Sequence, residues 1–171
     1  LRPLTVARRE RSVGTHRYAV LDVFTATPLE GNALAVVHDA DDLDEATMLR
    51  VARETRLSET TFVQAATAEG ADYRNRIFTM TGELPFAGHP SLGTAVAVAL
   101  ARGETSARYV QQTRAGLQPI DLRLDGRRGS ASMLQEPAEF GPEVDPAAAL
   151  APAGLEVAEA DPRLAPQIVS T

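Results

Sequence analysis

The chain has 171 residues, of which 44% are hydrophobic and 23% are charged, and its formal net charge is −6. A chain of this size and composition can form one globular domain, or one domain and part of a second. The acidic charge argues against nucleic acid as the main partner, because phosphate binding needs a basic surface. The sequence has no run of about 18 apolar residues, which is the length that a membrane-spanning helix needs, and we expect no signal peptide.

The residue types that are missing narrow the possible chemistry. The chain has no cysteine and no lysine. Disulfides, thiol nucleophiles, thiolate metal sites and a Schiff base on lysine are therefore excluded. His16, His38 and His89 are far apart and form no metal-binding pattern, so we expect no metal site. The absence of cysteine fits a cytoplasmic protein.

Hydrophobic patterns and turn residues predict an α+β arrangement after an arginine-rich extension at residues 1–14. Asp42 or Asp44 is expected to cap the first helix, because an aspartate can accept from the free N–H groups of the first turn. The predicted elements are strands at 16–25 and 33–39, a helix at 41–56, strands at 58–65 and 72–80, a helix at 91–101, and strands at 107–113, 119–124 and 129–135.

The helix predicted at 91–101 is apolar on every side, which indicates a buried helix rather than one on the surface. Pro90 suits its first turn and Gly103 its end. We therefore expect a mixed, mostly antiparallel sheet to wrap around this central helix. Residues 15–135 would form this domain.

Residues 136–171 are rich in proline, alanine and acidic residues. We interpret them as a linker and the start of a second domain, with a short helix near 146–151. The last residues, APQIVST, have a strand pattern. Nothing follows that could pair with such a strand, which suggests that the second domain is truncated.

The first segment that could carry chemistry is LSETTF, from Leu57 to Phe62. It places Glu59 between hydroxyl side chains, where the helix predicted at 41–56 gives way to a strand. A carboxylate at such a junction can be partly buried, which suits a general acid or base. The residues alone leave open an ordinary exposed or capping glutamate.

The second segment is ELPFAGHPSLGT, from Glu83 to Thr94. Gly88 lets a ligand approach the backbone closely, and His89 stands where the buried helix begins. The free N–H groups and the dipole of that helix end favour an anion, so a substrate carboxylate could bind there with His89 as donor. A helix start with a capping histidine is the alternative. The segment lacks the lysine of a P-loop, so nucleotide binding is excluded.

The third segment, from Phe24 to Asn32, is most simply a tight turn between two strands, in which Asn32 could touch a substrate. Arg74 and Arg76 alternate with polar positions on a predicted strand. We interpret these two arginines as part of a solvent-exposed face rather than an anion site.

These segments resemble successive signatures of the PhzF-like family of phenazine-biosynthesis isomerases. The similar stretches are HRYAVLDVFTATPLEGNALAVVHDADDL, LSETTFV and RIFTMTGELPFAGHPSLGTAVAVAL, in the order and at the separations usual for the family. The resemblance covers residues 16–135, with weaker similarity up to residue 171. The combination of LSET with FAGHPSLGTA is highly specific.

The resemblance implies the fold of diaminopimelate epimerase, in which two similar domains enclose the active site. It also implies a cofactor-independent isomerase that moves a proton between carbons of a small cyclic carboxylated metabolite, such as a dihydro-hydroxyanthranilate. Glu59 would be the acid/base, Gly88 and His89 would bind the substrate, and the full-length form would be a homodimer. The two-thiol mechanism of related epimerases is excluded, because the chain has no cysteine.

The chain departs from the family pattern in three respects. Ala33 replaces the proline that usually follows Gly-Asn, and Met80 replaces the proline of an FTP motif. The third difference is length, because the family's second domain supplies an aspartate and a glycine-rich loop that do not occur before Thr171. We therefore expect an incomplete isomerase. The alternatives are a catalytically inactive half, a partner-binding domain, or another enzyme on the same scaffold, such as a racemase-like or hydrolase-like member.

Overall fold

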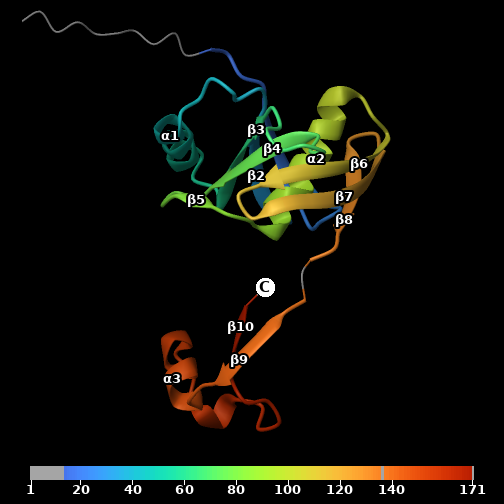
Figure 1. Ribbon diagram of the computed structural model, residues 1–171. Helices are drawn as coiled ribbons and strands as arrows, with labels where there is room; N and C mark the ends of the chain where they lie inside the picture. Colours follow the sequence, from blue (N-terminus) through green and yellow to red (C-terminus); the bar gives the residue numbers. More distant parts are fainter. Residues whose placement is uncertain (1–13, 136, 171) are drawn as a thin grey trace, which may run out of the picture. The chain divides into compact units, whose positions relative to one another are not determined.

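A computed structural model of the chain describes residues 14–135 and 137–170 (Figure 1). The predicted extension at residues 1–14 lies outside the described residues, apart from Gly14. The chain divides into two compact units, one ending at Met133 and the other starting at Leu134. No helix among the described residues is long and apolar enough to cross a membrane.

The first unit is an eight-stranded sheet with two helices, in the order β1-β2-β3-β4-β6-β7-β8, and β5 pairs with β4. Two neighbouring pairs, β2–β3 and β4–β6, are parallel, and the other pairs are antiparallel. The elements are β1 (Tyr18–Val23), β2 (Asn32–Val37), α1 (Glu45–Thr55), β3 (Glu59–Gln64), β4 (Tyr73–Phe78), β5 (Glu83–Leu84), α2 (Gly88–Arg102), β6 (Ser106–Thr113), β7 (Gly116–Asp125) and β8 (Arg128–Met133). The expected mixed, mostly antiparallel sheet is confirmed.

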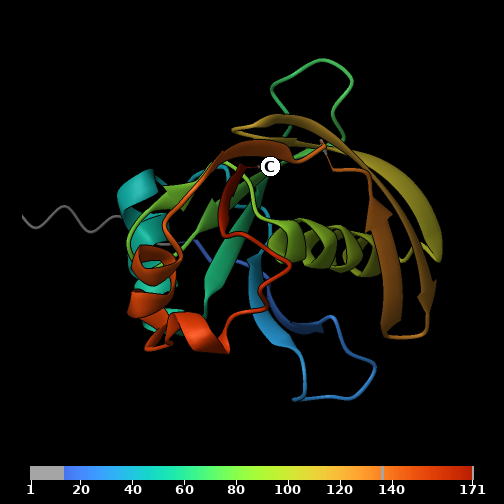
Figure 2. The same ribbon diagram turned by 90° about the horizontal axis from the view of Figure 1, so that it is seen from below.

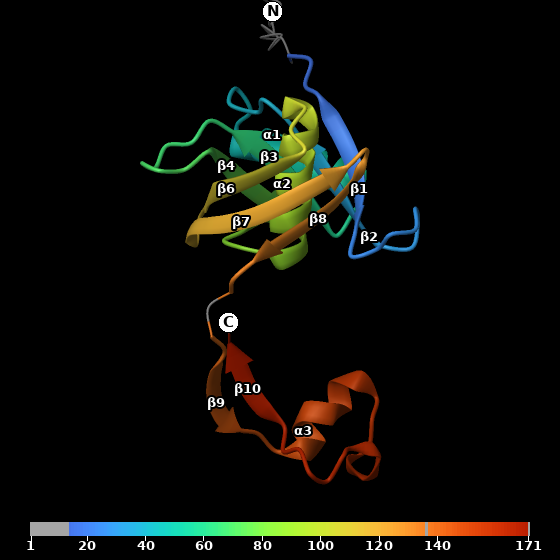
Figure 3. The same cartoon turned by 90° about the vertical axis from the view of Figure 1, so that its right-hand side faces the viewer.

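The sheet curls around α2, which lies at the centre of the unit (Figures 2 and 3). The helix ends at Gly103, whose φ of 71° is the left-handed conformation that glycine adopts without strain. Its buried side chains pack on the inner face of the sheet, where the rings of Tyr73 and Tyr109 meet edge to face at 5.7 Å. The central helix predicted from its apolar composition is therefore confirmed.

One side of α2 is less covered than the composition predicts, because β1 and β8 are the two edges of the curled sheet. A groove of about 1080 Å³ lies there, lined by residues of β1, α2 and β8. Leu100 is 36% exposed, and Val20 of β1 is 57% exposed. The prediction of a helix buried all round thus fails on this one side.

The outer face of the sheet is covered by α1, which packs on β3 and β4. Asp44 caps the helix, because its side chain accepts from the backbone N–H of Thr47 at 2.8 Å. Met48 and Ala52 are buried against Phe62 and other apolar residues of this layer. Of the two predicted capping residues, Asp44 is therefore the one used.

Arg76 is not on a solvent-exposed face, and that prediction is wrong. Its guanidinium donates two hydrogen bonds to Glu83, at 2.8 and 2.7 Å, and one to Glu45 at 3.0 Å. The Arg76 side chain is 12% exposed and that of Glu83 is 3% exposed. The β4–β5 turn brings the two together, and Phe78 lies under the guanidinium at 5.2 Å.

The second unit contains β9 (Glu139–Glu143), α3 (Pro146–Leu150), two short 3₁₀ turns (Ala151–Ala153 and Val157–Glu159) and β10 (Gln167–Ser170). The helix predicted near 146–151 is confirmed. The final strand was expected to lack a partner, and this expectation is wrong. It pairs antiparallel with the preceding β9, which the proline-rich and acidic composition concealed.

Candidate functional site

Glu59 is the first residue of β3 and follows closely on the end of α1. Arg56 ends that helix in the left-handed conformation, so the chain turns into the strand within three residues. The backbone of Glu59 lies beside Leu34 of the parallel strand β2. Its side chain is 17% exposed. The partial burial expected for this carboxylate is therefore observed.

His89 lies in the first turn of α2 and faces Glu59. Its Nε2 atom is 3.4 Å from the Oε2 atom of Glu59, and its side chain is 9% exposed. Both of these atoms are buried and lack a well-formed hydrogen bond. Such atoms are costly in a folded protein unless something else satisfies them, so a site for a polar ligand atom is indicated here.

Asn32 is the first residue of β2 and contacts the other side of the histidine ring. Its Nδ2 atom is 3.3 Å from Nδ1 of His89. Ser58, the residue before Glu59, donates its hydroxyl to Oδ1 of Asn32 at 3.1 Å. The three segments singled out in the sequence therefore meet at one place. Ser58 had no assigned role, and its only signal was its place in the LSE motif.

Gly31 explains how Asn32 reaches this position. A Cβ atom at residue 31 would lie 2.6 Å from the backbone oxygen of Val23 and 2.5 Å from a methyl carbon of Thr25. Only glycine allows the two backbones to come this close at the end of the β1–β2 pair. The Gly-Asn dipeptide thus combines a close backbone approach with a side chain aimed at His89.

The N-terminus of α2 adds backbone donors to the site. Gly88 is the first helical residue, and Ala87 at the cap position has no side-chain acceptor for the first-turn N–H groups. The positive end of the helix dipole lies here as well. Phe24 is an exposed aromatic side chain beside the site, with its ring 6.3 Å from that of His89 and 73% exposed.

Burial lowers the pKa of His89 below its usual value, and the nearby Glu59 carboxylate offsets this only in part. The ring is therefore neutral at neutral pH. A neutral imidazole has one N–H donor and one acceptor nitrogen. His89 can therefore give a hydrogen bond to an acidic group without adding a positive charge to the site.

Comparison with known proteins supplies the family. Residues 21–171 match the family model PhzC-PhzF, described as phenazine biosynthesis-like protein. The chain belongs to the PhzF-like family. The resemblance based on LSET and FAGHPSLGTA is therefore confirmed.

Relatives of this PhzF-like chain include proteins named as isomerases. This chain is 46% identical over 142 residues to the trans-2,3-dihydro-3-hydroxyanthranilate isomerase of Pseudomonas aeruginosa. The matched region covers 82% of this chain and 50% of the relative. Among solved structures, a predicted epimerase from Pseudomonas aeruginosa is 36% identical with a TM-score of 0.82, covering 91% of this chain and 56% of that one. A PhzF-family protein from Bacillus anthracis is 33% identical with a TM-score of 0.73, covering 89% and 50%. The chain thus spans about half the length of the relatives it matches.

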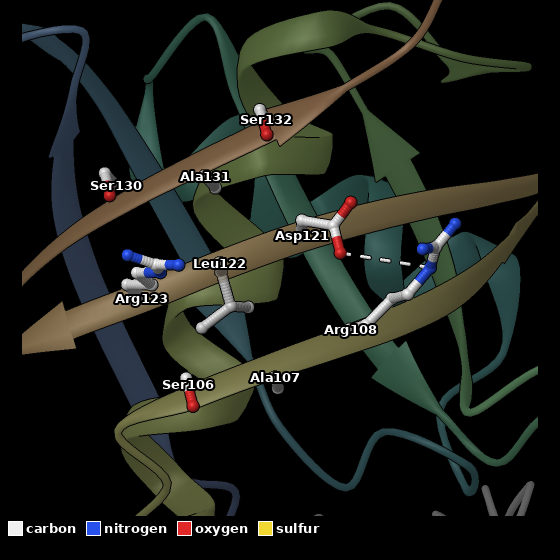
Figure 4. Close-up of a pocket in the computed structure, with 9 residues that line it drawn as sticks. All are labelled: Ser106, Ala107, Arg108, Asp121, Leu122, Arg123, Ser130, Ala131 and Ser132. Carbon is white, nitrogen blue, oxygen red and sulfur yellow. Dashed lines mark ion pairs between the residues drawn. The ribbon is translucent and has the colours of Figure 1, made fainter.

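Two hollows elsewhere on the PhzF-like unit are separate from Glu59 and His89. The groove beside α2 approaches the site at Phe24, whose ring is near that of His89, and at Val23, whose backbone pairs with Asn32. A hollow of about 650 Å³ lies over β6, β7 and β8, where Arg108 and Asp121 are 3.9 Å apart and Ser132 stands on β8 (Figure 4). No group of three acidic or histidine side chains that could hold a metal ion occurs within residues 14–135 and 137–170.

Proposed function

We propose that this chain carries one half of the active site of a PhzF-like isomerase, with Glu59 as the acid/base. The observation that supports this most directly is the pair formed by Oε2 of Glu59 and Nε2 of His89. These buried atoms lie 3.4 Å apart, and each lacks a well-formed hydrogen bond. In the proposed reaction the Glu59 carboxylate takes a proton from one ring carbon of the substrate, and the resulting acid returns it to another carbon. Bonds and charge balance without a cofactor.

The substrate carboxylate is proposed to bind at the N-terminus of α2. The first-turn N–H groups, beginning at Gly88, and the helix dipole favour an anion at this end. The N–H of the neutral His89 ring adds a donor within reach of the same place. An acidic group would satisfy these donors and would hold the reacting ring beside Glu59.

The proposed substrate is a small cyclic carboxylated metabolite. Support comes from the relatives, several of which are named trans-2,3-dihydro-3-hydroxyanthranilate isomerases. The chain spans about half the length of these relatives, so the activity of the whole protein is a proposal. We also propose that the protein needs no cofactor, forms a homodimer and is cytoplasmic. A domain without turnover, which binds a ligand or partner only, is the alternative that the experiment must separate.

Ligand binding by the chain can be measured by NMR with 3-hydroxyanthranilate, the aromatic counterpart of the relatives' substrate. We expect the backbone signals of Gly88 and His89 to shift on titration. Glu59→Gln keeps the side-chain volume, so it should change the affinity by less than about threefold while abolishing turnover. Glu69→Gln, in the exposed loop between β3 and β4, is the matched control. Shifts that are absent at α2 and confined to other surfaces would contradict the proposed binding site.

A further inference from the structure

The two nitrogens of the His89 ring face groups of different chemistry. Nε2 faces the Glu59 carboxylate at 3.4 Å, and a carboxylate only accepts hydrogen bonds. Nδ1 faces the side-chain amide of Asn32 at 3.3 Å, and an amide can either donate or accept, depending on its orientation. A neutral ring has one proton to share between these two sides, so the orientation of the amide and the tautomer of the ring are linked.

Only one combination makes every contact a donor facing an acceptor. With the Asn32 amide nitrogen donating to Nδ1, the ring proton lies on Nε2 and points toward the Glu59 carboxylate. If the amide were reversed, its oxygen would require a proton on Nδ1. The lone pair of Nε2 would then face the carboxylate, which is a repulsive arrangement in a buried site.

Ser58 is compatible with the first combination. Its hydroxyl donates to Oδ1 of Asn32 at 3.1 Å, and the amide nitrogen then faces His89. A hydroxyl can also accept, so the choice between the two amide orientations comes from the Glu59 carboxylate on the other side of the ring. The series of side-chain contacts that runs from Ser58 through Asn32 and His89 thus ends at Glu59, the neighbour of Ser58 in sequence. Serine and glutamate of the LSE motif therefore act on the same ring from its two sides.

We propose that Asn32, held in place by Ser58, is a positioning residue that keeps the neutral His89 ring in the tautomer with its proton on Nε2. Asn32 acts through the histidine rather than through contact with reacting atoms. The N–H group on Nε2 then faces the Glu59 carboxylate, or a ligand acid placed beside it, without adding a positive charge that would weaken the base. This catalytic meaning rests on the function proposed above, whereas the tautomer itself does not.

The tautomer can be read directly from the chain by NMR of ¹⁵N-labelled histidine, because protonated and unprotonated ring nitrogens resonate far apart. The chain has three histidines, so His16 and His38 serve as internal controls in every spectrum. The His89 signals are assigned by their loss in His89→Gln. We expect Nε2 of His89 to be protonated and Nδ1 to be unprotonated in the unliganded protein. A dominant Nδ1–H tautomer would overturn the proposal.

Variants of the two supporting residues give the second readout. Asn32→Asp replaces the donor by an acceptor of the same shape, so both ring nitrogens of His89 should become protonated at neutral pH. Ser58→Ala should turn one tautomer into a mixture, and Ser58→Thr, which keeps the hydroxyl, should restore it. Ser132→Ala, on the outer face of β8, is the matched control and should leave the spectrum unchanged (Figure 4).

An unchanged His89 pattern in both Asn32→Asp and Ser58→Ala would refute the role of these residues. If Asn32→Asp unfolds, the signals of His16 and His38 will show it, and the wild-type and Ser58 spectra still decide the question. The predicted tautomer in a protein that lacks isomerase activity would leave the positioning role standing and would count against the proposed function. Isomerase activity in a protein whose His89 ring is protonated on Nδ1 would support the proposed function and would refute the positioning role of Asn32.

Discussion

Replacing Gly31 with alanine tests the geometry that brings Asn32 to His89. The new Cβ atom would lie 2.6 Å from the backbone oxygen of Val23 and 2.5 Å from a methyl carbon of Thr25. Favourable C···O contacts lie at about 3.3 Å or more, so the overlap with the oxygen is about 0.7 Å. The oxygen belongs to the backbone at the end of the β1–β2 ladder, so relief requires the two strands to separate there.

Overpacking of this kind costs about 1–3 kcal/mol. Gly31 does not have a left-handed φ, so alanine brings no backbone strain there and returns about 0.4–1 kcal/mol by restricting the unfolded chain. We therefore expect Gly31→Ala to lower the free energy of unfolding by about 1–2 kcal/mol. The second expected effect is loss of the single His89 tautomer, because Asn32 moves with the strand end.

Urea unfolding followed by circular dichroism measures the first effect, and histidine NMR measures the second. Gly82→Ala is the matched control, because a Cβ atom at residue 82 meets nothing within 4 Å and its φ is not left-handed. The control should be as stable as the wild type or slightly more stable. A Gly31→Ala protein that matches the control in both assays would refute the close-approach explanation of the Gly-Asn dipeptide.

Three further predictions concern buried charge and titration. Glu83→Gln should lower the free energy of unfolding by about 2 kcal/mol in urea, because it removes the charge that pairs with a largely shielded guanidinium, whereas exposed Glu69→Gln should change it by less than about 0.5 kcal/mol; equal effects would contradict the partly buried pair. Burial lowers the pKa of both His38 and His89 below the ordinary histidine value of 6.5. Just below pH 6.5 the unfolded chain therefore binds more protons than the folded protein. Stability should therefore be full above pH 6.5 and should fall as the pH drops below it, by up to about 1.4 kcal/mol for each unit of pKa shift, and a flat profile between pH 7 and 5 would disagree. Burial, reinforced by a hydrogen bond to Glu104, raises the pKa of Tyr109 to about 12, so its ultraviolet titration should occur well above that of an exposed tyrosine, and ionisation near pH 10 would contradict its packing.

Local signals in the sequence were sufficient for the framework of the fold. The all-round apolar stretch predicted the central helix α2, and turn residues separated most of the strands correctly. The family motifs drew attention to the segments that meet at the site. These local signals could not predict contacts between residues that are far apart in the sequence. Arg76 is largely shielded from solvent where Glu83 arrives from the next strand, and β10 pairs with a segment that has little strand propensity.

The site shows the same division between local and distant information. Glu59 and His89 were identified by their places at the ends of helices, and the structure brings them within 3.4 Å of each other. Their catalytic and binding roles stay predictions. Asn32 was considered as a substrate contact, and Ser58 had no role, because a hydrogen bond between side chains 26 positions apart leaves no local pattern. Gly31 had a turn signal, but the contact with Val23 that requires glycine is visible only in three dimensions.

The most direct test of the central claim is proton transfer by Glu59. The longest form of the protein that its gene encodes is incubated in deuterated water with trans-2,3-dihydro-3-hydroxyanthranilate, and isomerisation and deuterium incorporation into the ring are followed by NMR and mass spectrometry. The wild type should isomerise the substrate, and Glu59→Gln should lose at least about 100-fold in turnover, which is the smaller end of the contribution of a general acid or base. The Glu69→Gln control should keep full activity. A Glu59→Gln protein as active as this control would contradict the account.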